Sequence, residues 1–274
     1  MTSIPSFPLN HGSAIPALGL GVYQAREGPE VESAVRTALD CGYRLVDTAA
    51  FYGNERGVGR AIRQSGLDRA EVFVTSKVWN RDQGYASTLR AFSDSLARLD
   101  LGYLDLYLVH WPVKGKFRAT WRALEEIYRS GRARAIGVSN FKEHHLNDLL
   151  AEATVTPALN QVELHPRLQQ FALREFCTAR GIVVQAWRPI LQGQVNGIPE
   201  LQAIGERYGK SGVQVTLRWM LQSGISTIPK STNPARIAHN ADVLDFALSE
   251  AELRAIAALD KGRRVGPDPD FIDF

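Results

Sequence analysis

The chain has 274 residues, of which 45% are hydrophobic and 22% are charged, and its net charge is +3. This is the composition of an ordinary globular protein, and because the chain has no long basic run we do not expect it to bind nucleic acid. No apolar stretch reaches the roughly 18 residues of a membrane-spanning helix, and the N-terminal residues do not resemble a signal peptide. We therefore expect a cytoplasmic protein that does not bind to a membrane.

Short apolar segments alternate with helical patterns along the whole chain. The predicted strands are residues 17–22, 43–47, 72–76, 104–109, 135–139, 158–162, 182–187 and 225–229. The predicted helices between them are residues 29–40, 85–99, 119–128, 145–151, 170–179 and 198–208. This alternation predicts a parallel sheet with helices outside, and eight strand units in about 250 residues predict a (β/α)8 TIM barrel.

Three further segments lie outside this regular pattern. Residues 7–9 and 14–16 predict an N-terminal hairpin, residues 213–221 an extra helix before the last strand, and residues 249–259 a C-terminal helix with Ser249 as its cap. No linker or low-complexity segment divides residues 1–274, so we expect a single domain.

A doubly wound sheet is the rival architecture, and it usually carries G-x-G-x-x-G after its first strand when it binds a dinucleotide. Gly19-Leu20-Gly21 lacks the third glycine, and Gly57-Val58-Gly59 opens a helix at the wrong place in the chain. A dinucleotide, if one is bound, must be held in another way.

Ionisable residues stand where the apolar strands should end. Asp47, Lys77 and His110 each close a predicted strand, and Tyr52 follows the second strand. Because the carboxyl ends of barrel strands share one face, these four side chains should lie together as a proton-transfer apparatus. Taken singly, Tyr52 could be a rim aromatic, Lys77 and Asp47 a structural ion pair, and His110 a core histidine.

Six motifs in order resemble those of the aldo-keto reductase family. They are Asp47-Thr-Ala-Ala-Phe-Tyr52-Gly-Asn-Glu55, Lys77-Val-Trp79, His110-Trp111-Pro112, Gly137-Val-Ser139-Asn140-Phe141, Asn160-Gln161-Val-Glu163-Leu-His165-Pro166 and Ile228-Pro229-Lys230-Ser231. The tail from Arg264 to Asp270 resembles the bacterial and protozoan branch of the family, which includes glyoxal/methylglyoxal reductases, 2,5-diketo-gluconate reductases and a prostaglandin F synthase. The resemblance implies NADPH-dependent reduction of a small-molecule carbonyl.

The roles of the four ionisable residues follow from that reaction. Carbonyl reduction needs a hydride, which no side chain supplies, and a proton, for which Tyr52 is the candidate. A free tyrosine has a pKa of about 10, and we expect the nearby Lys77 ammonium to lower it, with Asp47 holding Lys77 in place. His110 is expected to hydrogen-bond the substrate oxygen.

The resemblance also assigns cofactor contacts. Asn140 and Gln161, with Ser139 nearby, are expected to hold the nicotinamide carboxamide, and Trp187 to stack on the ring. A cationic cluster after the last strand suits the 2′-phosphate of NADPH, so we expect NADPH rather than NADH. The remaining expected cofactor contacts are Arg188, Lys230, Ser231, Thr232, Arg236 and Asn240.

The chain departs from the family at three places. Arg188 replaces a small residue near the expected pyrophosphate, where it could add a contact or crowd the loop at residues 191–197. His239 stands where the family often has Glu, and residues 112–118 form a short loop that implies an open substrate site.

An aromatic collar of Tyr23, Phe51, Trp79 and Trp111 should line the substrate pocket. It favours small 2-oxoaldehydes such as methylglyoxal, or aromatic aldehydes. A diketo-sugar acid is the second possibility, with Lys114 or Lys116 of the short loop as the cation that binds it, although both lysines could equally be solvated. The alternative function is an NADPH-binding regulatory or sensor subunit with slow turnover.

Two further expectations concern metal binding and assembly. His144 and His145 are neighbours on a helix and should point in different directions, so we expect no metal site there. We also expect a monomer.

Overall fold

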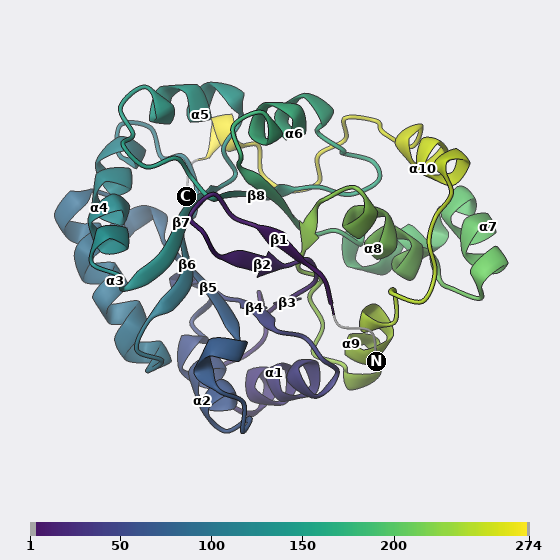
Figure 1. Cartoon of the computed structure of the whole chain (residues 1–274), viewed down its shortest axis with the longest axis horizontal. Coiled ribbons are helices and arrows are strands. Elements are labelled where there is room, and N and C mark those ends of the chain that lie inside the picture. The colour runs from purple at the N-terminus through teal and green to yellow at the C-terminus, as the bar shows by residue number, and fades with distance from the viewer. Residues whose placement is uncertain (1–3, 273–274) are drawn as a thin grey trace.

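The computed structural model describes residues 4–272, and its centre is a sheet of eight parallel strands. The strands follow one another around the sheet in chain order (Figure 1). Parallel bridges join Leu18 to Thr227 and Gly21 to Lys230, so the sheet closes into a barrel. The strands are β3 (Leu20–Gly21), β4 (Leu45–Asp47), β5 (Phe73–Val78), β6 (Leu104–Val109), β7 (Ala133–Ser139), β8 (Leu159–Glu163), β9 (Val183–Trp187) and β10 (Ser226–Thr227). The predicted (β/α)8 barrel is confirmed.

Helices surround the barrel (Figure 1). They are α1 (Pro29–Asp40), α2 (Glu55–Arg63), α3 (Tyr85–Leu99), α4 (Phe117–Arg129), α5 (Glu143–Leu150), α6 (Phe171–Thr178), α7 (Pro199–Tyr208), α8 (Gly212–Gln222), α9 (Pro234–Ala241) and α10 (Glu250–Ala257). The predicted extra helix is α8, and the predicted C-terminal helix is α10, in which Ser249 accepts a hydrogen bond from the Glu252 amide. None of the helices in residues 4–272 is long and apolar enough to cross a membrane.

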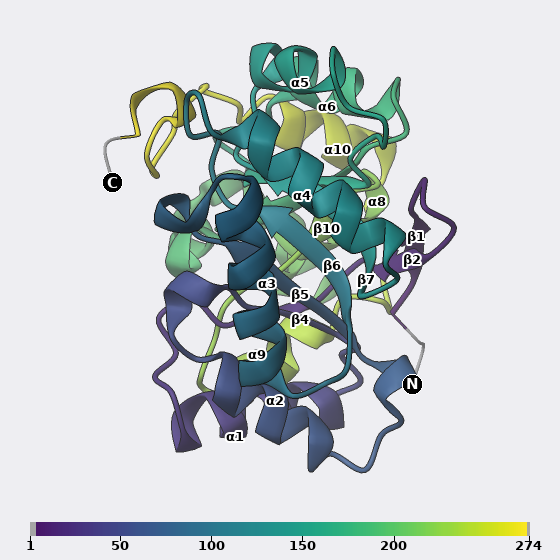
Figure 2. The ribbon, with the colours of Figure 1, turned by 90° about the vertical axis from the view of Figure 1, so that its left-hand side faces the viewer.

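An N-terminal hairpin closes one end of the barrel. Its strands are β1 (Ser6–Pro8) and β2 (Ala14–Pro16), as predicted. Leu9 and Ile15 of this hairpin join the apolar cluster inside the barrel, which includes Leu45, Phe73 and Leu106. Figure 2 shows the hairpin at one end of the barrel and the C-terminal tail at the other. The hairpin therefore blocks the end that lies away from the carboxyl ends of the strands.

Gly57 and Gly59, the second pair of glycines considered for dinucleotide binding, allow neighbouring helices to pack closely. A Cβ built at Gly59 would lie 1.9 Å from the carbonyl oxygen of Leu99, and one at Gly57 would lie 2.5 Å from Val31. These two glycines therefore let α2 approach α1 and α3 closely. Close helix packing therefore accounts for Gly57-Val58-Gly59, and a phosphate-binding role is not needed to explain these glycines.

Candidate active site

Three of the four expected ionisable residues meet in a buried network. Lys77 Nζ donates to Asp47 Oδ1 at 2.6 Å and to the Thr48 carbonyl at 2.8 Å, and it lies 3.3 Å from the Tyr52 hydroxyl. Lys77 is completely buried and Asp47 is 1% exposed. His110 follows β6, and its ring centre lies 5.9 Å from that of Tyr52 in an edge-on arrangement. The strand ends thus bring the four side chains together, as the sequence predicts.

Burial and mutual attraction act in opposite directions on the pKa values of the Asp47–Lys77 pair. Burial raises the pKa of Asp47, whereas the Lys77 charge and the bonds from Lys77 and Gln161 oppose that rise. Burial likewise lowers the pKa of Lys77, and the Asp47 charge opposes that fall. At 2.6 Å each charge therefore offsets part of the cost of burying the other.

The expectation that the pKa of Tyr52 lies below its usual value is wrong for the free protein. Burial raises the pKa of Tyr52 well above its usual value of 10.0, and the Asp47 charge adds to that rise. The negative charge of Asp47 thus opposes the attraction that the Lys77 ammonium has for a phenolate at Tyr52. Tyr52 is therefore a neutral phenol that keeps its proton until negative charge develops nearby.

His110 is also neutral. Burial lowers the pKa of His110 well below its usual value of 6.5, and the Lys77 charge lowers it further. A neutral imidazole can donate one hydrogen bond to a substrate oxygen, but it carries no charge that attracts an anion. Its Nδ1 is buried and has no hydrogen-bond partner among the described residues.

Two other residues of the first motif hold the tyrosine turn in place. Asn54 is buried, and its amide donates to the carbonyl oxygens of Val22 and Ala25 at 2.9 and 3.0 Å. Glu55 is buried as well, and it accepts hydrogen bonds from Ser76 at 2.5 Å and from Arg98 at 2.6 Å. These contacts anchor the chain directly after the 3₁₀ turn Ala50–Tyr52, so Asn54 and Glu55 help to position Tyr52.

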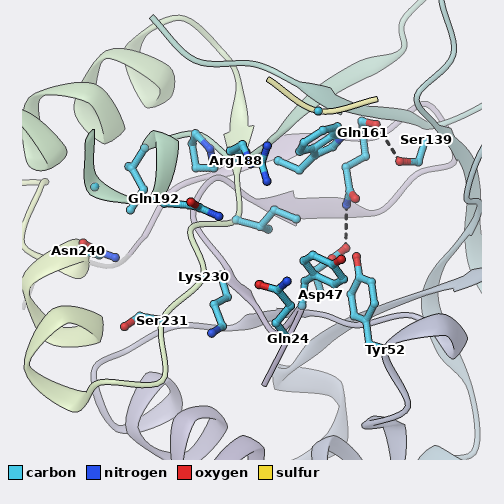
Figure 3. Close-up of a pocket in the computed structure, with 18 of the residues that line it drawn as sticks. Gln24, Asp47, Tyr52, Ser139, Gln161, Arg188, Gln192, Lys230, Ser231 and Asn240 are labelled. Atoms are coloured by element: carbon cyan, nitrogen blue, oxygen red, sulfur yellow. Dashed lines mark hydrogen bonds between the residues drawn. The ribbon is translucent and has the colours of Figure 1, made fainter. Parts of the chain in front are cut away.

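A cavity of about 820 Å³ opens at the carboxyl ends of the strands (Figure 3). Asp47, Tyr52 and His110 lie at its floor, and Lys77 lies beneath them without lining it. Every residue of the expected aromatic collar and every expected cofactor contact lines this cavity. These are Tyr23, Phe51, Trp79, Trp111, Ser139, Asn140, Gln161, Trp187, Arg188, Lys230, Ser231, Thr232, Arg236 and Asn240.

The collar is an apolar wall beside the polar floor. The rings of Phe51 and Trp79 stack with their centres 3.8 Å apart, and Trp79 meets His110 edge-on at 5.1 Å. Tyr23 and Phe51 are about half exposed, at 46% and 49%, and so form the mouth. Such a wall accepts flat or small apolar groups and keeps water from the floor.

The amides expected at the nicotinamide end are oriented by buried hydrogen bonds. Gln161 Nε2 donates to Asp47 Oδ2 and to Gln185 Oε1, both at 2.7 Å. Asn140 Nδ2 donates to the His110 carbonyl at 3.0 Å, and its Oδ1 accepts from Trp187 Nε1 at 2.8 Å. Both amides therefore turn their donors into the protein, which leaves oxygen lone pairs for the NH₂ group of a carboxamide.

The opposite end of the cavity is cationic. Arg188, Lys230 and Arg236 line it, and among residues 4–272 no carboxylate forms an ion pair with any of them, although Glu30 interacts with Lys230 at longer range. Unpaired cations beside the N-terminus of α9 form a binding site for anions. The chemistry of the lining residues thus fits a dinucleotide with phosphates at one end and a carboxamide at the other.

His239 and Asn240 both line the cavity near this end. His239 Nε2 lies 2.9 Å from Ser211 Oγ at the N-cap of α8. Asn240 is buried apart from the side that lines the cavity.

Two sequence expectations about surface residues need revision. Lys114 and Lys116 are exposed and do not line the cavity, so they are not placed to bind a sugar acid there. His144 and His145 do not point apart. Their Nε2 atoms lie 3.1 Å from each other, and both face Asp270 Oδ1, at 3.0 and 3.5 Å.

The histidine rings converge because His145 turns back to the start of its own helix. The backbone amide of Lys142 donates to His145 Nδ1 at 3.2 Å, so a neutral ring carries its proton on Nε2, facing Asp270. The Lys142 ammonium pairs with Asp268 at 2.5 Å and with Asp270 at 2.6 Å. This cluster fastens the C-terminal tail to α5.

Sequence reasoning missed part of the lining. Gln192 and Asn196 reach the cavity from the loop after β9, and Gly266 and Pro267 reach it from the C-terminal tail. The tail's run of glycine and prolines after the last helix was the available signal, because such a segment cannot continue a helix and must lie on the surface of the barrel.

Comparison with known proteins agrees with this geometry. Residues 17–261 match the sequence model of the Aldo/keto reductase family. Glyoxal reductase from Bacillus subtilis (strain 168) is 53% identical over 266 residues, which cover 97% of this chain and 96% of that protein. Methylglyoxal reductase DkgA from Escherichia coli (strain K12) is 44% identical over 266 residues, 96% of each protein. A crystal structure of a Gox0644 mutant in complex with NADPH has a TM-score of 0.93 at 42% identity and covers 100% of both chains.

Proposed function

Since the chain belongs to the aldo/keto reductase family and is an NADPH-dependent oxidoreductase, we propose that it reduces small 2-oxoaldehydes and aromatic aldehydes to alcohols, with Tyr52 as the proton donor. One observation carries the proposal. The Tyr52 hydroxyl lies at the floor of an aromatic cavity, 3.3 Å from an ammonium group that is otherwise held by Asp47.

NADPH supplies the hydride that reaches the carbonyl carbon. As negative charge develops on the carbonyl oxygen, Tyr52 transfers its hydroxyl proton to that oxygen and becomes a phenolate. Lys77 stabilises this phenolate across 3.3 Å, and solvent later restores the proton. The neutral His110 donates a hydrogen bond to the same carbonyl oxygen and fixes its direction.

The collar supports a neutral substrate over a sugar acid. Phe51, Trp79 and Trp111 offer aromatic surface to the part of the substrate away from the carbonyl. Lys114 and Lys116, the lysines that could bind a substrate carboxylate, do not line the cavity. Methylglyoxal fits this proposal because it has a reactive aldehyde and only a small uncharged remainder.

We assign the cofactor contacts to two groups of residues. Ser139, Asn140, Gln161 and Trp187 hold the nicotinamide, and the cationic end holds the phosphates and adenine. That second group consists of Arg188, Lys230, Ser231, Thr232, Arg236 and Asn240.

Tyr52→Phe tests the role of the tyrosine. NADPH oxidation with methylglyoxal and with benzaldehyde should fall by about 10²- to 10⁴-fold, while NADPH affinity measured by tryptophan fluorescence quenching stays unchanged. Undiminished turnover in Tyr52→Phe would exclude Tyr52 as the donor. A wild-type protein that binds NADPH but turns over none of these aldehydes would instead favour the sensor function.

A further inference from the structure

The C-terminal tail, residues 264–271, crosses the mouth of the barrel; one buried carboxylate fastens its first part, residues 264–266, and the cluster at α5 holds Asp268 and Asp270. Glu163, the last residue of β8, is completely buried. Its Oε1 accepts from the amides of Val265 at 2.8 Å and Gly266 at 3.1 Å, and its Oε2 accepts from Gly266 at 3.0 Å and from Arg264 Nη1 at 3.4 Å. His165 contributes a fifth contact, at 3.1 Å to Oε1. One side chain therefore binds three successive tail residues.

The carboxylate is suited to this task because it remains charged. Burial alone would raise the pKa of Glu163, but the hydrogen bonds from His165, Val265 and Gly266 lower it below its usual value. Hydrogen bonds to a charged acceptor are roughly twice as strong as neutral ones. The fastened part of the tail is thus a rigid element of the barrel mouth.

This rigid segment lies directly behind Trp187. Glu163 and Trp187 are register partners on the adjacent strands β8 and β9. Gly266 packs so closely that a Cβ built on it would lie 2.4 Å from Trp187 Cη2 and 3.1 Å from Cζ3. No side chain fits between the tail backbone and the indole.

The indole is also held at its polar edge. Trp187 Nε1 donates to Asn140 Oδ1 at 2.8 Å. The ring is therefore fixed between an amide at its pyrrole side and the tail backbone at its benzene side. Figure 3 shows the tail as a yellow ribbon crossing the cavity region near Arg188 and Gln161, and Gly266 and Pro267 line the cavity themselves.

We propose that Glu163 is a positioning residue for hydride transfer: by fastening Gly266 behind Trp187, it sets the plane of the indole against which the nicotinamide stacks. This inference rests on the proposed function, since it takes Trp187 as the stacking residue. It assigns a role to a side chain that touches neither substrate nor cofactor, and it explains why the tail carries glycine at residue 266.

Glu163→Gln tests the fastening. The amide keeps the size of the side chain but turns an NH₂ group toward tail donors, so the tail and the indole loosen. We expect NADPH affinity and kcat each to fall by about 10-fold or more, with the KM for methylglyoxal unchanged because Tyr52 and His110 are untouched. The isotope effect with NADPH deuterated at the transferred position should rise. Glu252→Gln, which alters a buried carboxylate far from the cavity, is the matched control and should leave all of these values unchanged.

Gly266→Ala tests the packing and leaves the charge in place. The added methyl group should push the indole and weaken NADPH binding by a similar factor, whereas Val265→Ala, which trims an exposed side chain of the same tail, should not. The effect of Gly266→Ala should largely disappear in a Trp187→Phe background, because phenylalanine lacks the atoms that the new methyl group would meet.

These outcomes separate the inference from the proposed function. If Gly266→Ala and Glu163→Gln bind NADPH as tightly as the wild type, with an unchanged isotope effect, the positioning role is wrong even though Tyr52→Phe is inactive. An equal effect of Gly266→Ala with Trp187 or Phe at residue 187 would also overturn it. A third outcome is that Tyr52→Phe is fully active while the double-mutant cycle of Gly266→Ala and Trp187→Phe shows coupled effects on NADPH binding. In that case the proposed chemistry is wrong, but the contact between the tail and the indole is supported.

Discussion

Asp47→Asn is the most informative change to the buried ion pair, since it removes one charge and keeps the shape. The Lys77 ammonium is then left at 0% exposure without its partner at 2.6 Å. The attraction lost is about 6 kcal/mol at an effective dielectric constant of about 20. The variant can avoid part of this loss by releasing the Lys77 proton. From an unfolded pKa of about 10.4, that release costs about 5 kcal/mol at pH 7 and about 2 kcal/mol at pH 9.

The sign of the pH dependence follows from the direction of the shift. Burial lowers the pKa of Lys77 in the folded state, and without Asp47 nothing comparable opposes that fall. Between the folded pKa and about 10.4 the unfolded state binds more protons, so the stability of the variant rises with pH by about 1.4 kcal/mol per unit. We therefore expect Asp47→Asn to lower the free energy of unfolding by up to about 5 kcal/mol at pH 7 and by clearly less at pH 9.

Urea unfolding of wild type and variant at several pH values, followed by circular dichroism, measures this difference. The double variant Asp47→Asn with Lys77→Met should be more stable than Asp47→Asn alone, because no buried charge remains. Asp105→Asn is the control: its partner Arg69 has a side chain that is 19% exposed, so the loss should be smaller. A destabilisation that stays the same from pH 7 to pH 9, or a double variant less stable than the single one, would refute the reasoning.

Two further predictions concern the cofactor and the histidine. Lys230→Ala combined with Arg236→Ala should weaken NADPH binding about 100-fold and NADH binding far less, by fluorescence titration, because only NADPH carries the 2′-phosphate; equal losses would remove that assignment. The rate of aldehyde reduction should not change between pH 8 and about pH 6, because burial and Lys77 keep the pKa of His110 well below its usual value. An inflection near pH 6.5 that is absent in His110→Gln would contradict the neutral imidazole.

The strands and the four ionisable residues could be predicted from the sequence because both depend on local patterns. Asp47, Lys77 and His110 stand out as charged or polar groups at the ends of apolar runs, and the barrel brings such ends together. The acidity of Tyr52 could not be predicted in the same way. It depends on how completely the phenol is buried and on how near the Asp47 charge lies, and both are properties of the folded site.

The contacts of the tail lay beyond sequence reasoning for a different reason. Glu163 and Gly266 are 103 residues apart, and nothing in either segment identifies the other as its partner. The convergence of His144 and His145 depends on a rotamer, since His145 turns back to accept from the Lys142 amide. Helical spacing predicts the direction of Cα–Cβ bonds but not where a long side chain ends.

The neutral Tyr52 also clarifies what Lys77 contributes to catalysis. An ammonium that made the phenol acidic in the free protein would favour the phenolate before the substrate arrived, and a phenolate cannot donate a proton. Because burial and the Asp47 charge raise the pKa of Tyr52, the resting phenol keeps its proton. Once that proton has moved, the same ammonium lies 3.3 Å from a full negative charge and stabilises it. Its stabilisation is then larger in the transition state than in the resting state, which is the condition for accelerating the chemical step.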